Sequence, residues 1–282
     1  MDRTPEFLAV GHVTKDLLPG GGFVVGGTAT YSALTARGLG LSVGVLTSAP
    51  VELDLSEALP DVELCRVPSE QATTFVNIYE GEHRRQFVHG VADMLKPSHL
   101  PAGWEKAPIV LLGPLVRELG AEWATVFPDA LVGVTPQGWM RQWNERGEVS
   151  PRSWLEAAEI LSGVDVLVFS EADVCSDEAL IQHYAGLAKL AVLTRGANGA
   201  RLFWRGTARG FAAFQAEEVD PTGAGDVFAA AFLVRLSESG DPYEATHFAN
   251  CTASFAIEGM GTSTLPARAQ VQERLRSGRL RC

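Results

Sequence analysis

Cysteine pairs, a secretion signal and long apolar runs are all missing from this sequence of 282 residues, and each absence excludes a class of protein. Its four cysteines are scattered without a Cys-x-x-Cys pair, so neither a zinc site nor a disulfide framework is indicated. No basic segment leads into an apolar one near the first residue, and no apolar run approaches the length of a membrane span. We therefore expect a cytoplasmic protein with reduced thiols, no signal peptide and no membrane contact.

Positive charge is also scarce. The chain has 23 Lys and Arg against 34 Asp and Glu, which gives a formal net charge of −11. This balance argues against nucleic acid or an anionic membrane as the main partner, although a nucleotide can still bind where positive groups are local. Hydrophobic residues make up 46% of the chain, enough for a substantial core, and no repeat or linker divides it. We expect one domain over residues 1–282.

Short apolar runs alternate with segments of helical spacing along the whole chain. The runs predict strands over residues 7–13, 42–48, 62–67, 109–114, 131–135, 164–169 and 190–194. The intervening segments predict helices over 29–39, 153–161, 176–187, 243–257 and 267–275. This alternation predicts an α/β fold with a doubly wound, mainly parallel sheet flanked by helices. Residues 73–79 and 84–89 surround a turn at 80–82 and predict a β-hairpin with one polar face.

The stretch from Val219 to Phe232 organises the rest of the chain. Asp220 and Pro221 end the preceding segment, and residues 223–225 (Gly-Ala-Gly) lead into an alanine-rich helix. The first N–H groups of a helix are unpaired and carry its positive dipole end, so they can hold phosphate. Because like charges repel, Asp226 does not fit as a phosphate ligand, but it could take the proton of an alcohol that attacks phosphorus. The alternative is an ordinary acidic residue in a first helical turn.

This stretch resembles the C-terminal signature of the ribokinase-like (PfkB) carbohydrate kinase family, Asp-Thr-x-Gly-Ala-Gly-Asp, in which the last aspartate is the catalytic base. The chain keeps Gly223, Ala224, Gly225 and Asp226, with Thr222 before them. The resemblance implies a ribokinase-like fold and transfer of the γ-phosphoryl group of ATP, with Mg²⁺, to a hydroxyl of a small sugar or cyclitol. Asp226 would be the base, residues 223–225 would neutralise the phosphoryl oxygens, and Thr222 would lie on the nucleotide side.

Residues near the N-terminus are expected to hold the acceptor. Asp16 follows the first predicted strand, where α/β enzymes bind ligands, and the family has an aspartate there for the sugar hydroxyls. A loop-capping role is the alternative for Asp16. Gly26 and Gly27 match the family's glycine pair, which lets the acceptor lie against the start of a helix. Tyr31 stands where many ribokinases have asparagine, and inositol-kinase-like members carry an aromatic residue there, which favours an inositol-like acceptor over ribose.

A second pair of segments resembles inositol-kinase-like proteins, namely Leu-Gly-Pro at 112–114 with Pro-Gln-Gly-Trp-Met-Arg at 136–141. Gln137 or Arg141 could therefore reach the acceptor, and a plain strand-to-helix turn explains this segment equally well. 

The family also places a small β-lid over the acceptor, and we expect it at about 14–26 and 70–92. It should be reduced, because the loop from Asp16 to Gly26 is short. Arg85 and Gln86 could face the substrate, although a solvated hairpin edge explains both better.

Further residues match the donor side of the family. Thr194, Gly196 and Gly199 reproduce its Thr-x-Gly-x-x-Gly pattern at the nucleotide phosphates. Arg195 would add positive charge beside the phosphoryl group, with a surface arginine as the alternative. Asn250 matches a family asparagine near the adenine.

The magnesium segment departs from the family. Its Asn-x-x-Glu pattern, which organises Mg²⁺ and phosphate through water, is replaced here by Ser170 and Asp173. A carboxylate still suits Mg²⁺, but Asp173 is one methylene shorter than glutamate, so Glu171 could share its role. Alternatively, these residues cap the helix predicted at 176–187.

Two other readings from the same residues remain open. The departure at Ser170 and Asp173 would suit a non-catalytic nucleotide- or sugar-binding relative, and a nucleoside could replace the polyol as acceptor. A dinucleotide-dependent oxidoreductase would need Gly-x-Gly-x-x-Gly after the first strand, and a P-loop would need a lysine near residue 27; the chain has neither. We expect a monomer or a homodimer.

Overall fold

Nine strands form the central sheet of the computed structural model, which describes residues 4–80 and 83–281. In spatial order they are β5 (Glu63–Pro68), β4 (Val43–Ala49), β1 (Phe7–Val10), β8 (Ile109–Leu112), β9 (Leu131–Val134), β12 (Val166–Ser170), β13 (Leu190–Thr194), β14 (Ala200–Trp204) and β15 (Thr207–Phe211). All pairings from β5 to β13 are parallel, and β14 and β15 join antiparallel at one edge. The predicted α/β fold with a mainly parallel sheet is confirmed.

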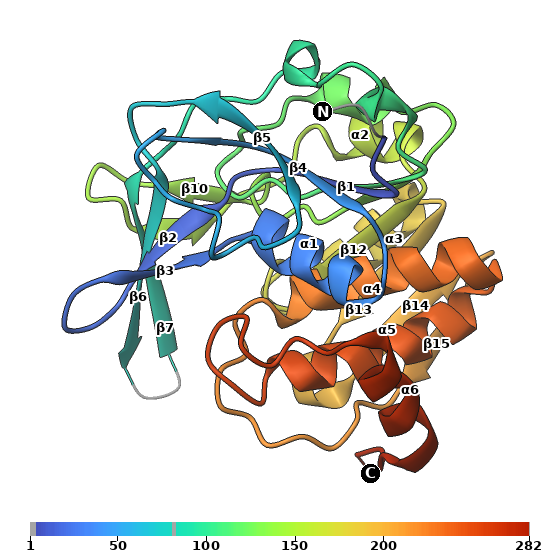
Figure 1. Cartoon of the computed structure of the whole chain (residues 1–282). Coiled ribbons are helices and arrows are strands. Elements are labelled where there is room, and N and C mark those ends of the chain that lie inside the picture. Colours follow the sequence, from blue (N-terminus) through green and yellow to red (C-terminus); the bar gives the residue numbers. More distant parts are fainter. Residues whose placement is uncertain (1–3, 81–82, 282) are drawn as a thin grey trace.

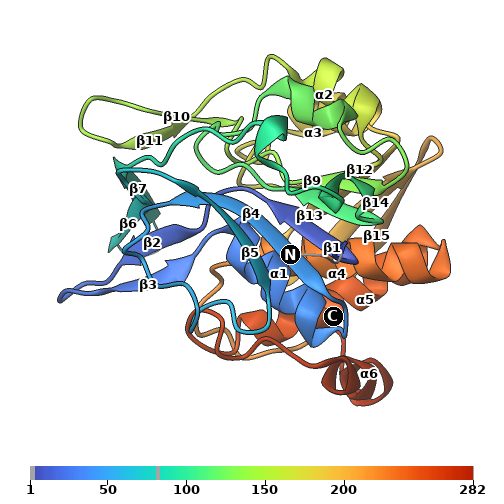
Figure 2. The ribbon, with the colours of Figure 1, turned by 45° about the horizontal axis from the view of Figure 1, so that its top comes forward.

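Helices cover both faces of this sheet (Figures 1 and 2). One face carries α1 (Thr28–Gly38), α4 (Ala224–Ser239), α5 (Pro242–Ala256) and α6 (Arg268–Ser277), and the other carries α2 (Ala157–Gly163) and α3 (Glu178–Leu187). Short 3-10 helices lie at Pro97–His99 (η1), Trp104–Lys106 (η2), Ala121–Thr125 (η3) and Gly196–Asn198 (η4). An apolar core lies on each side of the sheet, and alternate residues of β1 enter the two cores. Phe7 packs in the core that includes α1, α4 and α5, and Leu8 packs in the core that includes α2 and α3. Burial on both faces explains why β1 reads as a continuous apolar run.

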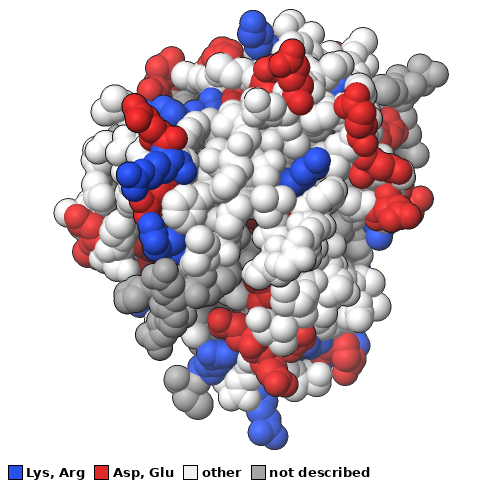
Figure 3. Space-filling view, turned by 90° about the vertical axis from the view of Figure 1, so that its left-hand side faces the viewer, with Lys and Arg blue, Asp and Glu red and all other residues white. Residues whose placement is uncertain are grey.

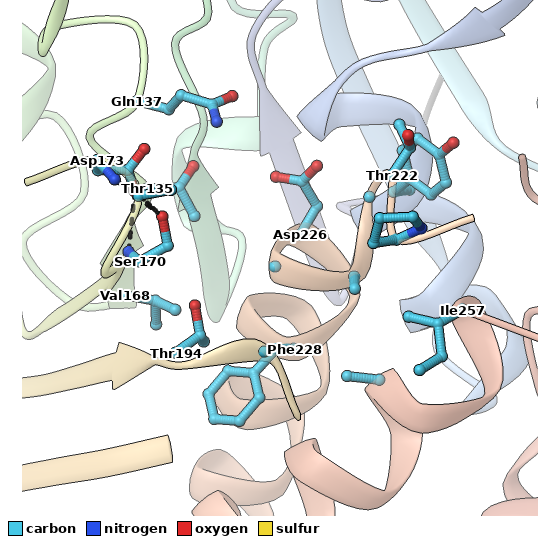
Figure 4. Close-up of a pocket in the computed structure, with 18 of the residues that line it drawn as sticks. Thr135, Gln137, Val168, Ser170, Asp173, Thr194, Thr222, Asp226, Phe228 and Ile257 are labelled. Atoms are coloured by element: carbon cyan, nitrogen blue, oxygen red, sulfur yellow. Dashed lines mark hydrogen bonds between the residues drawn. The ribbon is translucent and has the colours of Figure 1, made fainter. Parts of the chain in front are cut away.

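The central helix α4 brings its N-terminus to the edge of the sheet where the strands end. Residues from Val227 to Val234 are all buried, so this helix lies inside the protein rather than on it. Its first turn faces Thr135 and Thr194, which stand at the ends of β9 and β13 (Figure 4). Parallel α/β sheets bind ligands at this edge.

A second sheet projects to the left of the central one in Figure 1. It contains β3 (Phe23–Gly26), β2 (Thr14–Leu17), β6 (Thr73–Glu80) and β7 (His83–Gly90), in that order. The strand predicted over 7–13 is present but shorter, because β1 ends at Val10 and the chain then enters the second sheet at Thr14. Asp16 therefore lies within a strand and not in a capped loop. Of the turn predicted at 80–82, residues 81 and 82 lie outside the described part of the chain.

A small hairpin follows β9 where a strand-to-helix turn was the alternative reading. Its strands are β10 (Arg141–Trp143) and β11 (Val149–Pro151), and α2 begins only at Ala157. The plain strand-to-helix turn is therefore wrong, as is a helix start at 153. Trp154 instead stacks on Trp139, with ring centroids 5.2 Å apart, and this packing fixes an extended approach to α2.

The side of the molecule that carries the second sheet is hollowed near its centre, and charged side chains lie mostly around its rim (Figure 3). Over residues 4–80 and 83–281, no helix has the length and apolar character that a membrane crossing requires.

Candidate active site

One cavity of about 540 Å³ collects almost every residue that the sequence assigned to a site. It opens where β9, β12 and β13 end against the N-terminus of α4. Its lining includes the predicted residues Asp16, Gly27, Tyr31, Gln137, Arg141, Glu171, Asp173, Thr194, Arg195, Gly196, Gly199, Thr222, Gly223, Ala224, Gly225, Asp226 and Asn250. Gly26 is the predicted site residue that does not line it.

The Gly-Ala-Gly turn builds the start of α4. Gly223 has φ 79° and ψ −6°, a left-handed conformation that glycine adopts at little cost, and it precedes the first helical residue. A Cβ atom at Gly223 would also lie 2.3 Å from Cδ1 of Tyr31. The N–H of Ala224 donates to the carbonyl of Pro221 at 3.3 Å, whereas those of Gly223 and Gly225 donate no hydrogen bond to any described residue. These last two groups are therefore available to an anion.

Asp226 lies in the first turn of α4, and its carboxylate points into the cavity (Figure 4). Its Oδ1 accepts a hydrogen bond of 2.7 Å from Oγ1 of Thr28. Burial raises the pKa of Asp226 to about 6, against the opposing effects of the Thr28 hydrogen bond and the charge of Arg141. The charges of Asp173 and Asp16 add to the rise. Asp226 is thus mostly ionised at pH 7 but far more basic than an exposed aspartate.

The end of the cavity that is predicted to hold the acceptor is lined by the second sheet. Asp16 on β2 accepts from Oγ1 of Thr14 at 3.1 Å, and Gly26 on the neighbouring β3 lies directly behind its carboxylate. A Cβ atom at Gly26 would be 2.4 Å from Oδ2 of Asp16, so Gly26 makes room for that side chain. Gly27 does line the cavity.

Gln86 faces the cavity, although the sequence favoured a solvated hairpin edge over a substrate contact for this residue. Its Nε2 donates to Oδ1 of Asn77 at 3.0 Å across the β6–β7 pair, and both side chains line the cavity. Arg85 points the other way and forms an ion pair with the exposed Glu148. A solvated edge is therefore the right account of Arg85 and the wrong one of Gln86. The strand alternation of the hairpin was the signal, because neighbouring residues face opposite sides.

Tyr31 on α1 is buried, with 2% of its surface exposed. Burial, together with the charges of Asp16, Asp220 and Asp226, raises its pKa well above the usual value, so the phenol stays neutral. The ring packs against Gly223 and thereby supports the turn that precedes α4. Its position connects the acceptor end of the cavity with the anion site.

Gln137 and Arg141 reach the cavity from the segment after β9. Gln137 lies above Thr135, across from Asp226 (Figure 4). Thr135 is 7% exposed, and its hydroxyl oxygen has no hydrogen-bond partner among the described residues. Buried hydroxyl groups are normally paired, so an unpaired one in a cavity wall marks a contact for water or a ligand.

The magnesium segment forms a closed local turn. Oδ2 of Asp173 accepts from the N–H and the hydroxyl of Ser170, both at 2.8 Å (Figure 4). Glu171 is paired with Arg195 at 2.8 Å. The helix-capping alternative is wrong, because Asp177 caps α3 through the N–H groups of Ala179 and Leu180. Arg195 is likewise not a lone surface cation, since Glu171 offsets its charge.

The end of the cavity that is predicted to hold the donor lies beyond α4 and includes residues without a sequence motif. Thr194 stands at the end of β13, and Asn250 on α5 donates to the carbonyl of Ala212 at 3.4 Å. Residues 279–281 run beside this region: the N–H of Arg281 donates to the carbonyl of Ala213 at 2.8 Å. Phe214 and Arg281 thus line the same cavity. No local pattern around Arg281 indicates this position.

Residues 148–268 match the model of the pfkB family carbohydrate kinases, and they include the whole Gly-Ala-Gly-Asp turn described above. This part of the chain is similar to the ribokinase-like (PfkB) kinase family. This kinase is a phosphotransferase with an alcohol group as acceptor.

Relatives of known name agree with this assignment. The kinase is 28% identical over 257 residues to the cytidine kinase of Thermococcus kodakarensis. The aligned region covers 85% of this chain and 91% of that protein. It has the fold of a pyrophosphate-dependent kinase of the ribokinase family solved with a pyrophosphate analog and myo-inositol: TM-score 0.78, 24% identity, 95% and 99% of the two chains covered. It also has the fold of Arabidopsis thaliana ribokinase complexed with ribose and ATP: TM-score 0.76, 19% identity, 97% and 99% covered.

Proposed function

We propose that this kinase transfers the γ-phosphoryl group of ATP to a hydroxyl of a small polyol of the inositol type, with Asp226 as general base. The observation that carries the proposal is the carboxylate of Asp226, which lies in the cavity beside an anion-binding helix start and has a pKa of about 6. A base with that pKa is ionised at neutral pH and can accept a proton in the transition state.

Each group in the cavity has a role in this reaction. Oδ2 of Asp226 takes the proton of the acceptor hydroxyl, and the oxygen of that hydroxyl bonds to the γ-phosphorus. The bond from phosphorus to the β,γ-bridging oxygen breaks, and ADP leaves. The N–H groups of Gly223 and Gly225, at the positive end of α4, stabilise the charge on the phosphoryl oxygens. Arg141, whose charge acts on Asp226, adds a cation beside them.

The acceptor end favours a polyol over a nucleoside. Its polar groups Asp16, Asn77, Gln86 and Gln137 offer several acceptors and donors to neighbouring hydroxyls. Tyr31 supports the same choice as an aromatic residue where many ribokinases have asparagine. The similarity to a structure that holds myo-inositol agrees with it. A nucleoside is the second candidate, because the relative that matches 85% of this chain is a cytidine kinase.

The donor end favours a nucleoside triphosphate over pyrophosphate. Beyond the start of α4 the cavity continues along Phe214, Ala253, Ile257 and Arg281, a mostly apolar extension that a pyrophosphate has no need to fill. An adenosine group would bury apolar surface there. Pyrophosphate is the alternative donor, since a neighbour of the same fold depends on it.

Mg²⁺ suits this site only with help from the donor. Among the described residues, no group of three acidic, His or Cys side chains could hold a metal ion. Asp173 has Oδ1 left over after Ser170 occupies Oδ2, whereas Glu171 is held by Arg195. Because Mg²⁺ keeps several waters and binds phosphate oxygens, Asp173 would hold it through water with the phosphates as further ligands. Mg²⁺ would reduce the repulsion between the donor and the acidic groups of the cavity.

The test is a panel assay on the purified chain. Inositols, pentoses, hexoses and nucleosides are offered with ATP or pyrophosphate, with and without Mg²⁺, and ADP or phosphate release is measured together with the phosphorylated product. We expect Mg²⁺-dependent, ATP-driven phosphorylation of a polyol. Product from a nucleoside alone would favour the second candidate, and nucleotide binding without turnover on any acceptor would favour the non-catalytic relative.

The remaining expectations extend this proposal. We infer that the second sheet, β3-β2-β6-β7, acts as a small lid within one domain, because it contributes Asp16, Asn77 and Gln86 to the acceptor end. A cytoplasmic location and a monomeric or homodimeric state without nucleic-acid partners stay predictions from the sequence.

A further inference from the structure

Thr28 is far from the proposed base, Asp226, in the sequence but contacts it in the folded protein. It is the first residue of α1, is 2% exposed, and lies 198 positions before Asp226. Its hydroxyl donates to Oδ1 of Asp226 at 2.7 Å, a short hydrogen bond to an ionisable acceptor. Neither the family pattern around Gly26 and Gly27 nor the proposed reaction has assigned it a role.

The hydroxyl of Thr28 is directed differently from its neighbours in α1. The buried hydroxyl groups of Thr30, Ser32 and Thr35 donate back to carbonyls four residues earlier, as is usual within a helix. That of Thr28 leaves the helix and reaches α4. Its methyl group is wedged against Gly113, where a Cβ atom would lie 2.3 Å from Cγ2 of Thr28. A β-branched side chain has few rotamers, so this packing fixes the direction of the hydroxyl.

The contact distinguishes the two oxygens of the carboxylate. Oδ1 of Asp226 is occupied by Thr28, and no described residue donates a hydrogen bond to Oδ2. The charged groups that act on this carboxylate from the surrounding elements are Arg141, which favours its ionised form, and Asp173 and Asp16, which disfavour it. Thr28 therefore acts with Arg141 and against the two acids.

We propose that Thr28 is a positioning residue for phosphoryl transfer: its hydroxyl holds Oδ1 of Asp226 so that Oδ2 faces the acceptor alcohol in the ionised state. This inference rests on the proposed role of Asp226 as base. Thr28 itself touches no substrate in this proposal. Its effect is expected in turnover and in the pH dependence, and not in substrate affinity.

The variants Thr28→Val, Thr28→Ser and Thr28→Ala separate the hydroxyl from the methyl group, and Thr35→Val is the matched control. Thr35 is also buried in α1, but its hydroxyl binds the carbonyl of Tyr31 and does not reach the cavity. For Thr28→Val we expect kcat to fall by roughly 10- to 100-fold with unchanged KM values, and the acid limb of kcat/KM to move up by about one pH unit. Thr28→Ser keeps the hydroxyl but loses the methyl group that directs it, so it should lie between the wild type and Thr28→Ala. Thr35→Val should keep the wild-type pH profile.

A second measurement does not depend on turnover. In protein labelled with ¹³C at Asp carboxyl carbons, the Asp226 signal is assigned from its loss in Asp226→Asn and followed through a pH titration. We expect its midpoint to rise in Thr28→Val and Thr28→Ala and to return at least in part in Thr28→Ser. If the wild type transfers no phosphoryl group, the proposed function fails while this titration still tests the contact. An unchanged midpoint in Thr28→Val, or a shifted midpoint with unchanged kcat, overturns the inference, as does a Thr28→Ser protein that behaves like Thr28→Ala.

Discussion

Replacing Asp226 by asparagine should make the protein more stable and at the same time almost inactive. In the folded state burial raises the pKa of Asp226 from 3.8 to about 6, so the ionised carboxylate is held where it is poorly solvated. By linkage, this costs the folded state up to ~3 kcal/mol at pH 7. Asparagine keeps the shape and loses the charge, so Asp226→Asn should recover much of that cost. Turnover should fall by roughly 10²- to 10⁴-fold, because the general base is gone.

The size of the stability effect depends on pH. A carboxyl group whose folded pKa is raised destabilises the fold fully above that pKa, and this destabilisation is lost as the pH falls below the unfolded value. The gain in Asp226→Asn should therefore be largest above about pH 6 and should vanish near pH 4. In the wild type, kcat/KM should fall as the pH drops through about 6, because the base becomes protonated.

Urea denaturation at pH 7.5 and at pH 4, with turnover measured on the same preparations, tests both effects. Asp129→Asn is the matched control, since Asp129 is exposed and lies outside the cavity. A variant that is less stable than the wild type at pH 7.5 would refute the reasoning from burial. A variant that keeps near-normal turnover would remove Asp226 from the role of base.

Three further substitutions test other parts of the site. Gly223→Ala should lose activity and destabilise the fold by at least ~1–2 kcal/mol, because alanine strains the left-handed turn and clashes with Tyr31; equal stability by urea denaturation would contradict the close packing. Gln86→Leu should raise KM for the acceptor at least several-fold and leave KM for the donor unchanged in steady-state assays, because it removes a polar group of the lid; an effect on donor KM alone would misplace Gln86. Arg281→Ala should weaken ATP binding in calorimetry. Arg279→Ala should not, because Arg279 is exposed and lies outside the cavity; equal ATP affinities of the wild type and Arg281→Ala would exclude Arg281 from the donor end.

Local sequence patterns were sufficient to predict the strands and helices that are buried on both sides. Strands such as β8 and β13 have apolar runs with clear ends, and α4 is apolar all round behind its Gly-Ala-Gly start. For these elements, burial of every face leaves a strong signal in the sequence. β2 and β3 leave a weak one, because each has only four residues, most of them partly exposed, and β2 pairs with the distant strand β6. The first strand was consequently predicted too long, and the second sheet was only partly foreseen.

The side chains that tune the site were harder to foresee than those that define it. The motif around Asp226 indicates a carboxylate at a helix start, but its basicity depends on neighbours that only the topology supplies. Thr28 approaches because α1 and α4 lie side by side on the same face of the sheet, and Arg141 because a hairpin follows β9 in place of a helix. Neither interaction has a local signature, since one spans 198 positions and the other depends on a segment whose form the sequence left open. A motif can therefore indicate the proposed base, whereas the pKa of that group is a property of the assembled fold.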